Sequence, residues 1–183
     1  MGKYIRHVKN ILIVIALFST GLSYAQTFKG HASGTFGIVN RKVRVQYEIP
    51  IKSNASYGIN MNYYLANWKG PVFEPFIRTY RKKDGNTEGF FGQAKLIYGN
   101  LSTLDSNIFG GAIVNKRWST YGFGISCGNK FLLGKHFTIE YITGVRLLSA
   151  PPVTYDYYNY DKLGWYLTTG LPIDLQLKFG FQF

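Results

Sequence analysis

Histidine and cysteine often serve as general bases, nucleophiles and metal ligands, and this chain of 183 residues is poor in both. It contains three histidines, His7, His31 and His136, and one cysteine, Cys127. Isolated histidines and a lone cysteine supply too few ligands for a metal ion, so we predict no metal site. A hydrolytic site needs a base beside a hydroxyl nucleophile and an acid. Glu140 follows His136 by four residues, but no serine stands beside them, so we predict no catalytic residue.

One glycine-rich stretch, "GFGISCG" at 122–128, resembles a nucleotide-binding turn only superficially. A dinucleotide-binding turn leads into a helix, whereas no helical pattern follows here and the glycines alternate with larger side chains. Such alternation is typical of a strand. We therefore predict no cofactor. We expect Gly122, Gly124 and Gly128 to make room for Tyr and Arg side chains inside the fold.

Charged side chains form the larger chemical pattern. In "IDLQLKFGFQF", which ends the chain, Leu175, Leu177 and three phenylalanines alternate with Asp174, Lys178 and uncharged residues. A strand turns successive side chains to opposite faces, so this segment has one apolar and one polar face. The same alternation places acids and bases on the polar faces of other segments. We predict that they form one ion-pair network, made of Arg44, Glu48, Glu74, Arg78, Lys95, Glu140, Arg146, Asp174 and Lys178.

Eight alternating segments must position these charges. The chain is 17% aromatic and contains 21 glycines, and beyond residue 26 no stretch has a convincing 3.6-residue period. We therefore predict an all-β protein. The expected strands are 28–38, 42–49, 57–65, 72–81, 91–99, 119–128, 136–148 and 173–183. Because proline cannot donate a ladder hydrogen bond, we expect at Pro75 either a bulge or a strand whose paired part begins later.

The polar faces decide between two all-β folds. In a soluble sandwich they would meet water, whereas in a small membrane barrel they face a narrow lumen where charges must pair. Mixed acids, bases and amides opposite apolar or small side chains favour the barrel. We predict an eight-stranded antiparallel up-and-down transmembrane β-barrel. The connections agree, because three are short (50–56, 82–88 and 129–135) and the two longest (100–118 and 149–172) fall together at the opposite end.

The first residues have the layout of a secretory signal peptide. Three basic residues precede an apolar run at 11–18, and "SYA" at 23–25 provides a small-x-small cleavage site. The apolar run is far shorter than the roughly 20 residues of a membrane helix. We expect residues 1–25 to be removed as a signal peptide and residues 26–183 to form one barrel domain.

Charge and cysteine content narrow the possible partners. The chain has 21 Lys and Arg against 9 Asp and Glu, and three of the basic residues lie in the signal, so the remainder carries a net charge of +9. Basic residues scattered along an exported chain do not indicate nucleic acid, and we expect no such partner. A single cysteine cannot form an internal disulfide, so the fold must hold without one.

Aromatic residues form two predicted groups. Interfacial girdles of a barrel would contain Tyr63, Trp68, Tyr98, Trp118 and Tyr121 at the outer rim and Phe28, Tyr57, Phe137, Phe181 and Phe183 at the inner rim. The connection 149–172 offers a rigid amphipathic surface suited to binding. Its candidate contact residues are Tyr155, Tyr157, Tyr158, Tyr160, Trp165 and Tyr166. Alternatively, these side chains pack on one another or on lipopolysaccharide.

The sequence also resembles a known family. "YGFGISCGNKFLLGKHFTIEYITGVRL" resembles the Gly-rich strand, "LGK" turn and alternating strand of small Bacteroidetes-type outer-membrane barrels of unknown function. "FIRTYRKKDGNTEGFFGQAKLIYG" is similar to that family's strand–basic turn–strand unit, and "LQLKFGFQF" to its closing strand. The resemblance implies a porin-like barrel without known catalytic residues. Phe179, Phe181 and Phe183 resemble the terminal signal that the barrel assembly machinery recognises.

These patterns favour a monomeric, non-enzymatic barrel of the bacterial outer membrane, in contact with its lipid and lipopolysaccharide. Eight strands leave an interior just wide enough for side chains, so we expect a structural or surface-interaction role, with an unknown ligand, rather than a solute pore. One alternative is a lipid-directed enzyme, similar to lipid A deacylases. Another is a channel for small hydrophobic ligands, which requires a lateral opening or an uncharged lumen.

Overall fold

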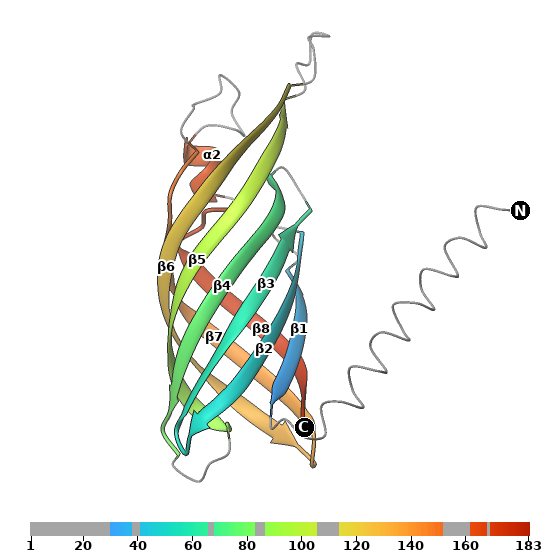
Figure 1. The fold of residues 1–183 in the computed structure, drawn as a ribbon, viewed down its shortest axis with the longest axis vertical. Helices are drawn as coiled ribbons and strands as arrows, with labels where there is room; N and C mark the ends of the chain where they lie inside the picture. Colours follow the sequence, from blue (N-terminus) through green and yellow to red (C-terminus); the bar gives the residue numbers. More distant parts are fainter. Residues whose placement is uncertain are drawn as a thin grey trace, which may run out of the picture.

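The computed structural model describes residues 30–37, 41–65, 68–82, 87–105, 114–151, 162–167 and 169–183. Eight antiparallel strands form one closed barrel in which neighbours in sequence pair and β1 pairs with β8 (Figure 1). The predicted all-β, eight-stranded, up-and-down barrel is confirmed. The strands are β1 (His31–Gly37), β2 (Lys42–Lys52), β3 (Ala55–Tyr64), β4 (Trp68–Tyr80), β5 (Gly89–Asp105), β6 (Val114–Leu133), β7 (Phe137–Leu148) and β8 (Ile173–Gln182). The predicted signal peptide, 1–25, lies outside the described residues.

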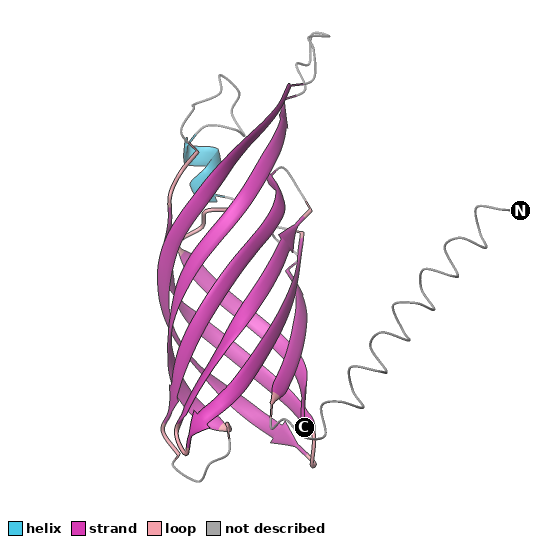
Figure 2. Ribbon diagram, in the orientation of Figure 1, coloured by secondary structure: helices cyan, strands magenta, loops and turns pink. Residues whose placement is uncertain are grey.

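The two ends of the barrel differ. At the lower end of Figure 1, the strands β2, β4 and β6 end near the C-terminus; we call this the turn end. The opposite, loop end carries the short helix α2 (Lys162–Leu167), cyan in Figure 2. Within the described ranges, no helix has the length and apolar character needed to cross a membrane.

Several strands run further than their alternation predicts. β4 begins at Trp68 rather than at 72, and β6 continues to Leu133 rather than ending at 128. β5 and β6 also pair up to Asp105↔Val114. Most of the predicted long connection 100–118 is therefore a β-ladder, and that prediction is wrong. The extended hairpin persists because its inward side chains at Leu101 and Trp118 are buried in an apolar cluster.

Pro75 neither forms a bulge nor delays the strand, so both expectations for it are wrong. It lies within β4 and is paired with Ile59 of β3. On the β5 side, Phe73↔Tyr98 and Phe76↔Lys95 keep one register on both sides of the proline. The strand tolerates a missing donor because the ladder to β3 remains continuous.

Burial alternates along the strands, as in β4, where every second residue from Trp68 to Tyr80 is buried. The outward side chains in the middle of the wall are uncharged and mostly large and apolar, including Ile77, Leu96 and Leu175, which are 63%, 68% and 72% exposed. The exposed basic residues lie near strand ends or in connections. In the described part they are Arg41, Lys52, Lys69, Arg81, Lys82, Arg117 and Lys135.

Inward glycines make room for neighbouring side chains, although mostly not for the Tyr and Arg that we expected. A Cβ at Gly124 would lie 2.9 Å from Lys95 Cε and 3.2 Å from Arg146 Cβ, and one at Gly122 would lie 2.0 Å from the Leu147 carbonyl oxygen. A Cβ at Gly128 would lie 2.2 Å from the Tyr141 carbonyl oxygen and 2.8 Å from Phe91 Cζ.

Gly128→Ala should therefore lower the free energy of unfolding by about 1–3 kcal/mol, the usual cost of overpacking. Gly92→Ala is the matched control, because a Cβ at that position meets none of the described atoms within 4 Å. Its effect should stay within about 0.5 kcal/mol. Urea unfolding in lipid vesicles measures both, and equal effects would show that the interior at Gly128 can relax freely.

Candidate functional site: a charged lumen capped by tryptophans

The barrel interior, which we call the lumen, holds the main concentration of polar groups in the described chain. All nine residues of the predicted network are buried there. Lys42 and Lys130 lie there too and were absent from the prediction. Lys42 has the same parity as Arg44, and Lys130 lies on the part of β6 beyond the predicted end at 128. Strand parity within the predicted strand 42–49 would have found Lys42, and following the alternation past 128 would have found Lys130.

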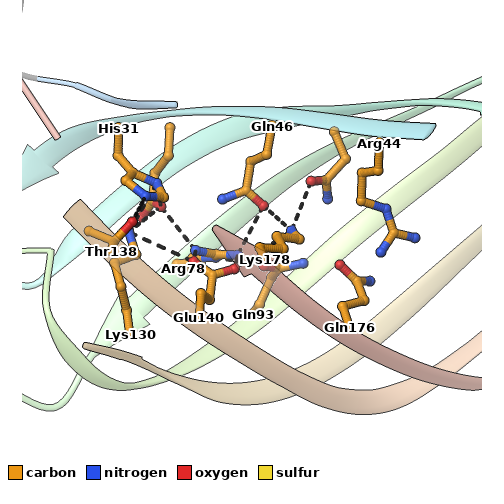
Figure 3. A network of polar contacts seen from close by, with 12 residues as sticks. His31, Arg44, Gln46, Arg78, Gln93, Lys130, Thr138, Glu140, Gln176 and Lys178 are labelled. Atoms are coloured by element: carbon orange, nitrogen blue, oxygen red, sulfur yellow. Dashed lines mark hydrogen bonds and ion pairs between the residues drawn. The ribbon is translucent and has the colours of Figure 1, made fainter. Parts of the chain in front are cut away.

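Arg78 is the centre of a cluster near the turn end (Figure 3). Its Nη1 donates to Glu48 Oε2 at 2.9 Å and to Glu140 Oε2 at 2.8 Å, and its Nη2 donates to Glu140 Oε1 at 2.8 Å. The guanidinium also lies 4.2 Å from the centre of the Phe91 ring. Lys130 Nζ donates to Glu48 Oε2 at 2.6 Å. The turn-end cluster thus joins four strands by charge-assisted hydrogen bonds.

A histidine completes the turn-end cluster. His31 Nε2 lies 2.6 Å from Thr138 Oγ1, and its Nδ1 lies 3.6 Å from Glu48 Oε2. A hydroxyl, an imidazole and a carboxylate in line resemble a hydrolytic triad. Here, however, Thr138 is 3% exposed and Glu48 is already held by Arg78 and Lys130. The arrangement therefore has the burial and pairing of a structural link between β1, β2 and β7.

Ligand atoms of His31, Glu48 and Glu140 lie within 4.8 Å of one another, which is close enough to consider a metal ion. Three cationic side chains already engage these carboxylates, since Arg78 bonds both, Lys130 bonds Glu48, and Lys178 Nζ lies 3.6 Å from Glu140 Oε1. A divalent cation would have to displace them against their positive charge. His136, in contrast, is exposed in the turn before β7 and stacks on Phe181 at 5.0 Å.

A second cluster, which we call the middle cluster, surrounds Lys95. Lys95 Nζ lies 2.8 Å from Glu74 Oε2 and 2.5 Å from Asp174 Oδ2. Arg44 donates from Nε to Asn62 Oδ1, and its Nη2 is 3.9 Å from Asp174. Arg146, also in this cluster, donates to two backbone carbonyls of the segment before β8, Thr169 at 3.0 Å and Leu171 at 3.1 Å. Arg146 thereby fixes that segment against the wall.

The ion pairs cross the lumen rather than follow single strands. Arg44 and Glu48 share one face of β2, and Glu74 and Arg78 share one face of β4, yet neither pair is joined. Arg78 instead reaches Glu140 on β7. Neighbouring strands contribute at Lys178 and Glu140, register partners whose charged atoms are 3.6 Å apart. The lumen is thus narrow enough for side chains from facing strands to form ion pairs.

A tryptophan cluster fills the lumen near the loop end. The ring centres of Trp68 and Trp118 are 4.8 Å apart, and Trp165 of α2 packs on them at 5.4 and 5.6 Å. Trp68 and Trp165 are fully buried and Trp118 is 9% exposed. The prediction of Trp68 and Trp118 in an outer girdle is wrong, as is that of Trp165 on a binding surface. Inward parity and the return of α2 to the barrel place all three inside.

The other predicted surface residues have mixed outcomes. Tyr166 is 41% exposed on α2, whereas Tyr155, Tyr157, Tyr158 and Tyr160 lie outside the described residues.

Of the predicted assembly signal, Phe179 is 58% exposed on the outer wall, and Phe181 packs on Phe137 and Phe183. Recognition of these three phenylalanines by the assembly machinery stays a prediction.

No protein-family model matches the chain, and no curated protein matches it. A solved structure to which it is similar is the N-terminal β-barrel domain of OprF from Pseudomonas aeruginosa. The TM-score is 0.49 at 9% sequence identity, and the match covers 85% of this chain and 96% of that chain. Membership of the Bacteroidetes-type family stays a prediction.

Proposed function

We propose that the protein is a non-enzymatic barrel of the bacterial outer membrane, with a structural or surface-interaction role. The observation that carries this proposal is the division of side chains by face. Large hydrophobic residues such as Ile125 and Leu175 are more than half exposed on the outer wall, while the buried charges face the lumen. Water would disfavour such a wall, whereas hydrocarbon favours it. We propose further that both termini lie in the periplasm, so that the loop end faces outward.

The filled lumen supports a structural rather than a pore-forming role. Its ion-pair clusters and tryptophan cluster occupy the interior, as expected for a barrel of eight strands. A heat-modifiable gel shift of the protein in the membrane fraction tests the proposal. Migration as a compact species without boiling supports a membrane barrel, and recovery only from the soluble fraction would refute it.

A lipid-directed enzyme is the second candidate, because Thr138, His31 and Glu48 lie in line. Their burial favours the structural role. Mass spectrometry of lipid A from cells with and without the protein separates the two functions. Identical acyl patterns are expected, and a changed pattern that Thr138→Val abolishes would establish the enzyme.

A charged side chain introduced on the outer wall should show whether that wall lies in lipid. Leu96, in the middle of β5, is 68% exposed. Leu96→Lys should lower the free energy of unfolding in lipid vesicles by about 2–4 kcal/mol, the cost of a cation near the bilayer midplane. The matched control is Leu133→Lys at the turn end of β6, for which about 0–1 kcal/mol is expected near the interface. Equal small effects would contradict burial of the Leu96 face in lipid.

A further inference from the structure

The ladder between β1 and β8 closes only part of the barrel wall. In the described residues it runs from His31↔Gln182 to Gly34↔Phe179. Beyond Gly34, residues up to Gly37 continue to pair with β2, and β8 continues to pair with β7 as far as Ile173. β1 is the shortest strand, with 7 residues, so the wall has a seam between β1 and β8 toward the loop end.

A cavity of about 720 Å³ lies at this seam. Its apolar lining includes Phe36 of β1 and Leu175 and Leu177 of β8, which are 58%, 72% and 51% exposed on the outer wall. Lys42 and Arg44, which are buried side chains of the lumen, also line it. One cavity therefore connects the apolar exterior with the charged interior. This is the lateral opening that a hydrophobic-ligand site requires.

The cations at the seam are incompletely compensated. The described lumen buries seven Lys and Arg side chains against four Asp and Glu, an excess of three positive charges. No described carboxylate lies within ion-pair distance of Lys42, whose amine contacts the Tyr64 hydroxyl at 3.4 Å. Arg44 Nη2 is 3.9 Å from Asp174 and has no hydrogen-bond acceptor in the described chain. A buried guanidinium nitrogen without an acceptor in the described chain has a donor available for an added anion. Figure 3 shows Arg44 and Gln176 at the opposite end of the drawn network from His31.

We propose that the seam binds an anionic membrane lipid, whose phosphate contacts Lys42 and Arg44 and whose acyl chain lies along Phe36, Leu175 and Leu177. The inference rests on the proposed membrane location and adds a ligand class to it. The polarity of the site matches a lipid of the leaflet nearer the loop end. Lys42 follows the β1–β2 connection at that end, and β8 runs from Leu175 toward the turn end, as an acyl chain would run toward the bilayer centre.

Native mass spectrometry of the folded protein, released from detergent micelles, tests the proposal. The probes are phosphatidylglycerol and phosphatidylcholine with the same acyl chains, together with inorganic phosphate as a competitor. We expect the parent to bind phosphatidylglycerol about tenfold more tightly than phosphatidylcholine, and Lys42→Gln to remove most of that preference. Lys52→Gln, an exposed lysine outside the cavity, is the matched control and should bind like the parent.

A second variant keeps the test decisive if Lys42→Gln folds poorly. Thr35 lines the same cavity, and Thr35→Trp fills it while leaving both cations in place, so binding of both lipids should fall. Equal affinity of the parent for the two lipids would overturn the proposal, as would equal losses in Lys42→Gln and Lys52→Gln. Displacement of phosphatidylglycerol by inorganic phosphate would show that the site binds free anions, and it would overturn the proposal of a lipid ligand. If the protein migrates as a compact species but binds the two lipids equally, only the lipid site is refuted. If no compact species forms, the membrane barrel itself is refuted.

Discussion

Arg78→Ala should lower the free energy of unfolding by about 3–5 kcal/mol, because it removes the cation that two buried carboxylates share and leaves each with a weaker set of partners. Arg78 bonds Glu48 and Glu140 at 2.8 to 2.9 Å, and the side chains of all three are at most 1% exposed. Its Nε also donates to Gln93 Oε1 at 2.6 Å, so the substitution removes a neutral partner as well. Urea titration in lipid vesicles, followed by the compact-to-unfolded gel shift, gives the value.

Lys82→Ala provides the matched control. Lys82 pairs with Glu88 at 3.9 Å at the turn end, and its side chain is 56% exposed. Water screens such a pair, so we expect a change of about 0–1 kcal/mol. If Arg78→Ala also stays within about 1 kcal/mol of the parent, water enters the lumen freely and the dry ion-pair network is wrong. Arg78→Lys should fall between parent and alanine, since an amine cannot reproduce the bidentate contact with Glu140.

Alternation of side chains is a local property, and it predicted which face of the wall each side chain occupies. It predicted that Glu48, Arg78 and Glu140 share the interior, because strand parity assigns each residue to a face. It could not predict that these three meet. That depends on how far each strand is staggered against the next around the closed barrel, a quantity set by all eight pairings together. Arg78 and Glu140 are separated by 62 positions.

The misplaced tryptophans have a different physical reason. Aromatic residues at strand ends suit an interfacial girdle and a packed interior equally well. Parity would have placed Trp68 inside, since it lies on the Glu74 face of β4. Trp165 had no such guide, because its burial depends on a helix that turns back into the barrel. The seam between β1 and β8 could not be predicted either. The predicted first strand, 28–38, is longer than β1, which ends at Gly37, and so it suggested a complete ladder.

Trp165→Ala should destabilise the docked form of α2 by about 3–5 kcal/mol, the usual cost of truncating a fully buried tryptophan. α2 has six residues, too few to be a stable helix by itself. Its position depends on packing between Trp165 and the rings of Trp68 and Trp118. The Gly170 amide also donates to the Trp165 carbonyl oxygen at 2.7 Å, so the residues before β8 are held at the same point.

The loss should appear first as local opening, because the strands pair without help from α2. Trypsin, which cleaves after lysine, should then cut at Lys162 at least about tenfold faster in Trp165→Ala than in the parent. Tyr166→Ala is the matched control, because its side chain is 41% exposed on the same helix; we expect cleavage and urea stability near those of the parent. Indistinguishable cleavage in the two variants would mean that α2 is held by contacts other than the tryptophan cluster. Faster cleavage with an unchanged gel shift would show that the cluster closes the lumen at the loop end while the ion-pair clusters independently hold the wall.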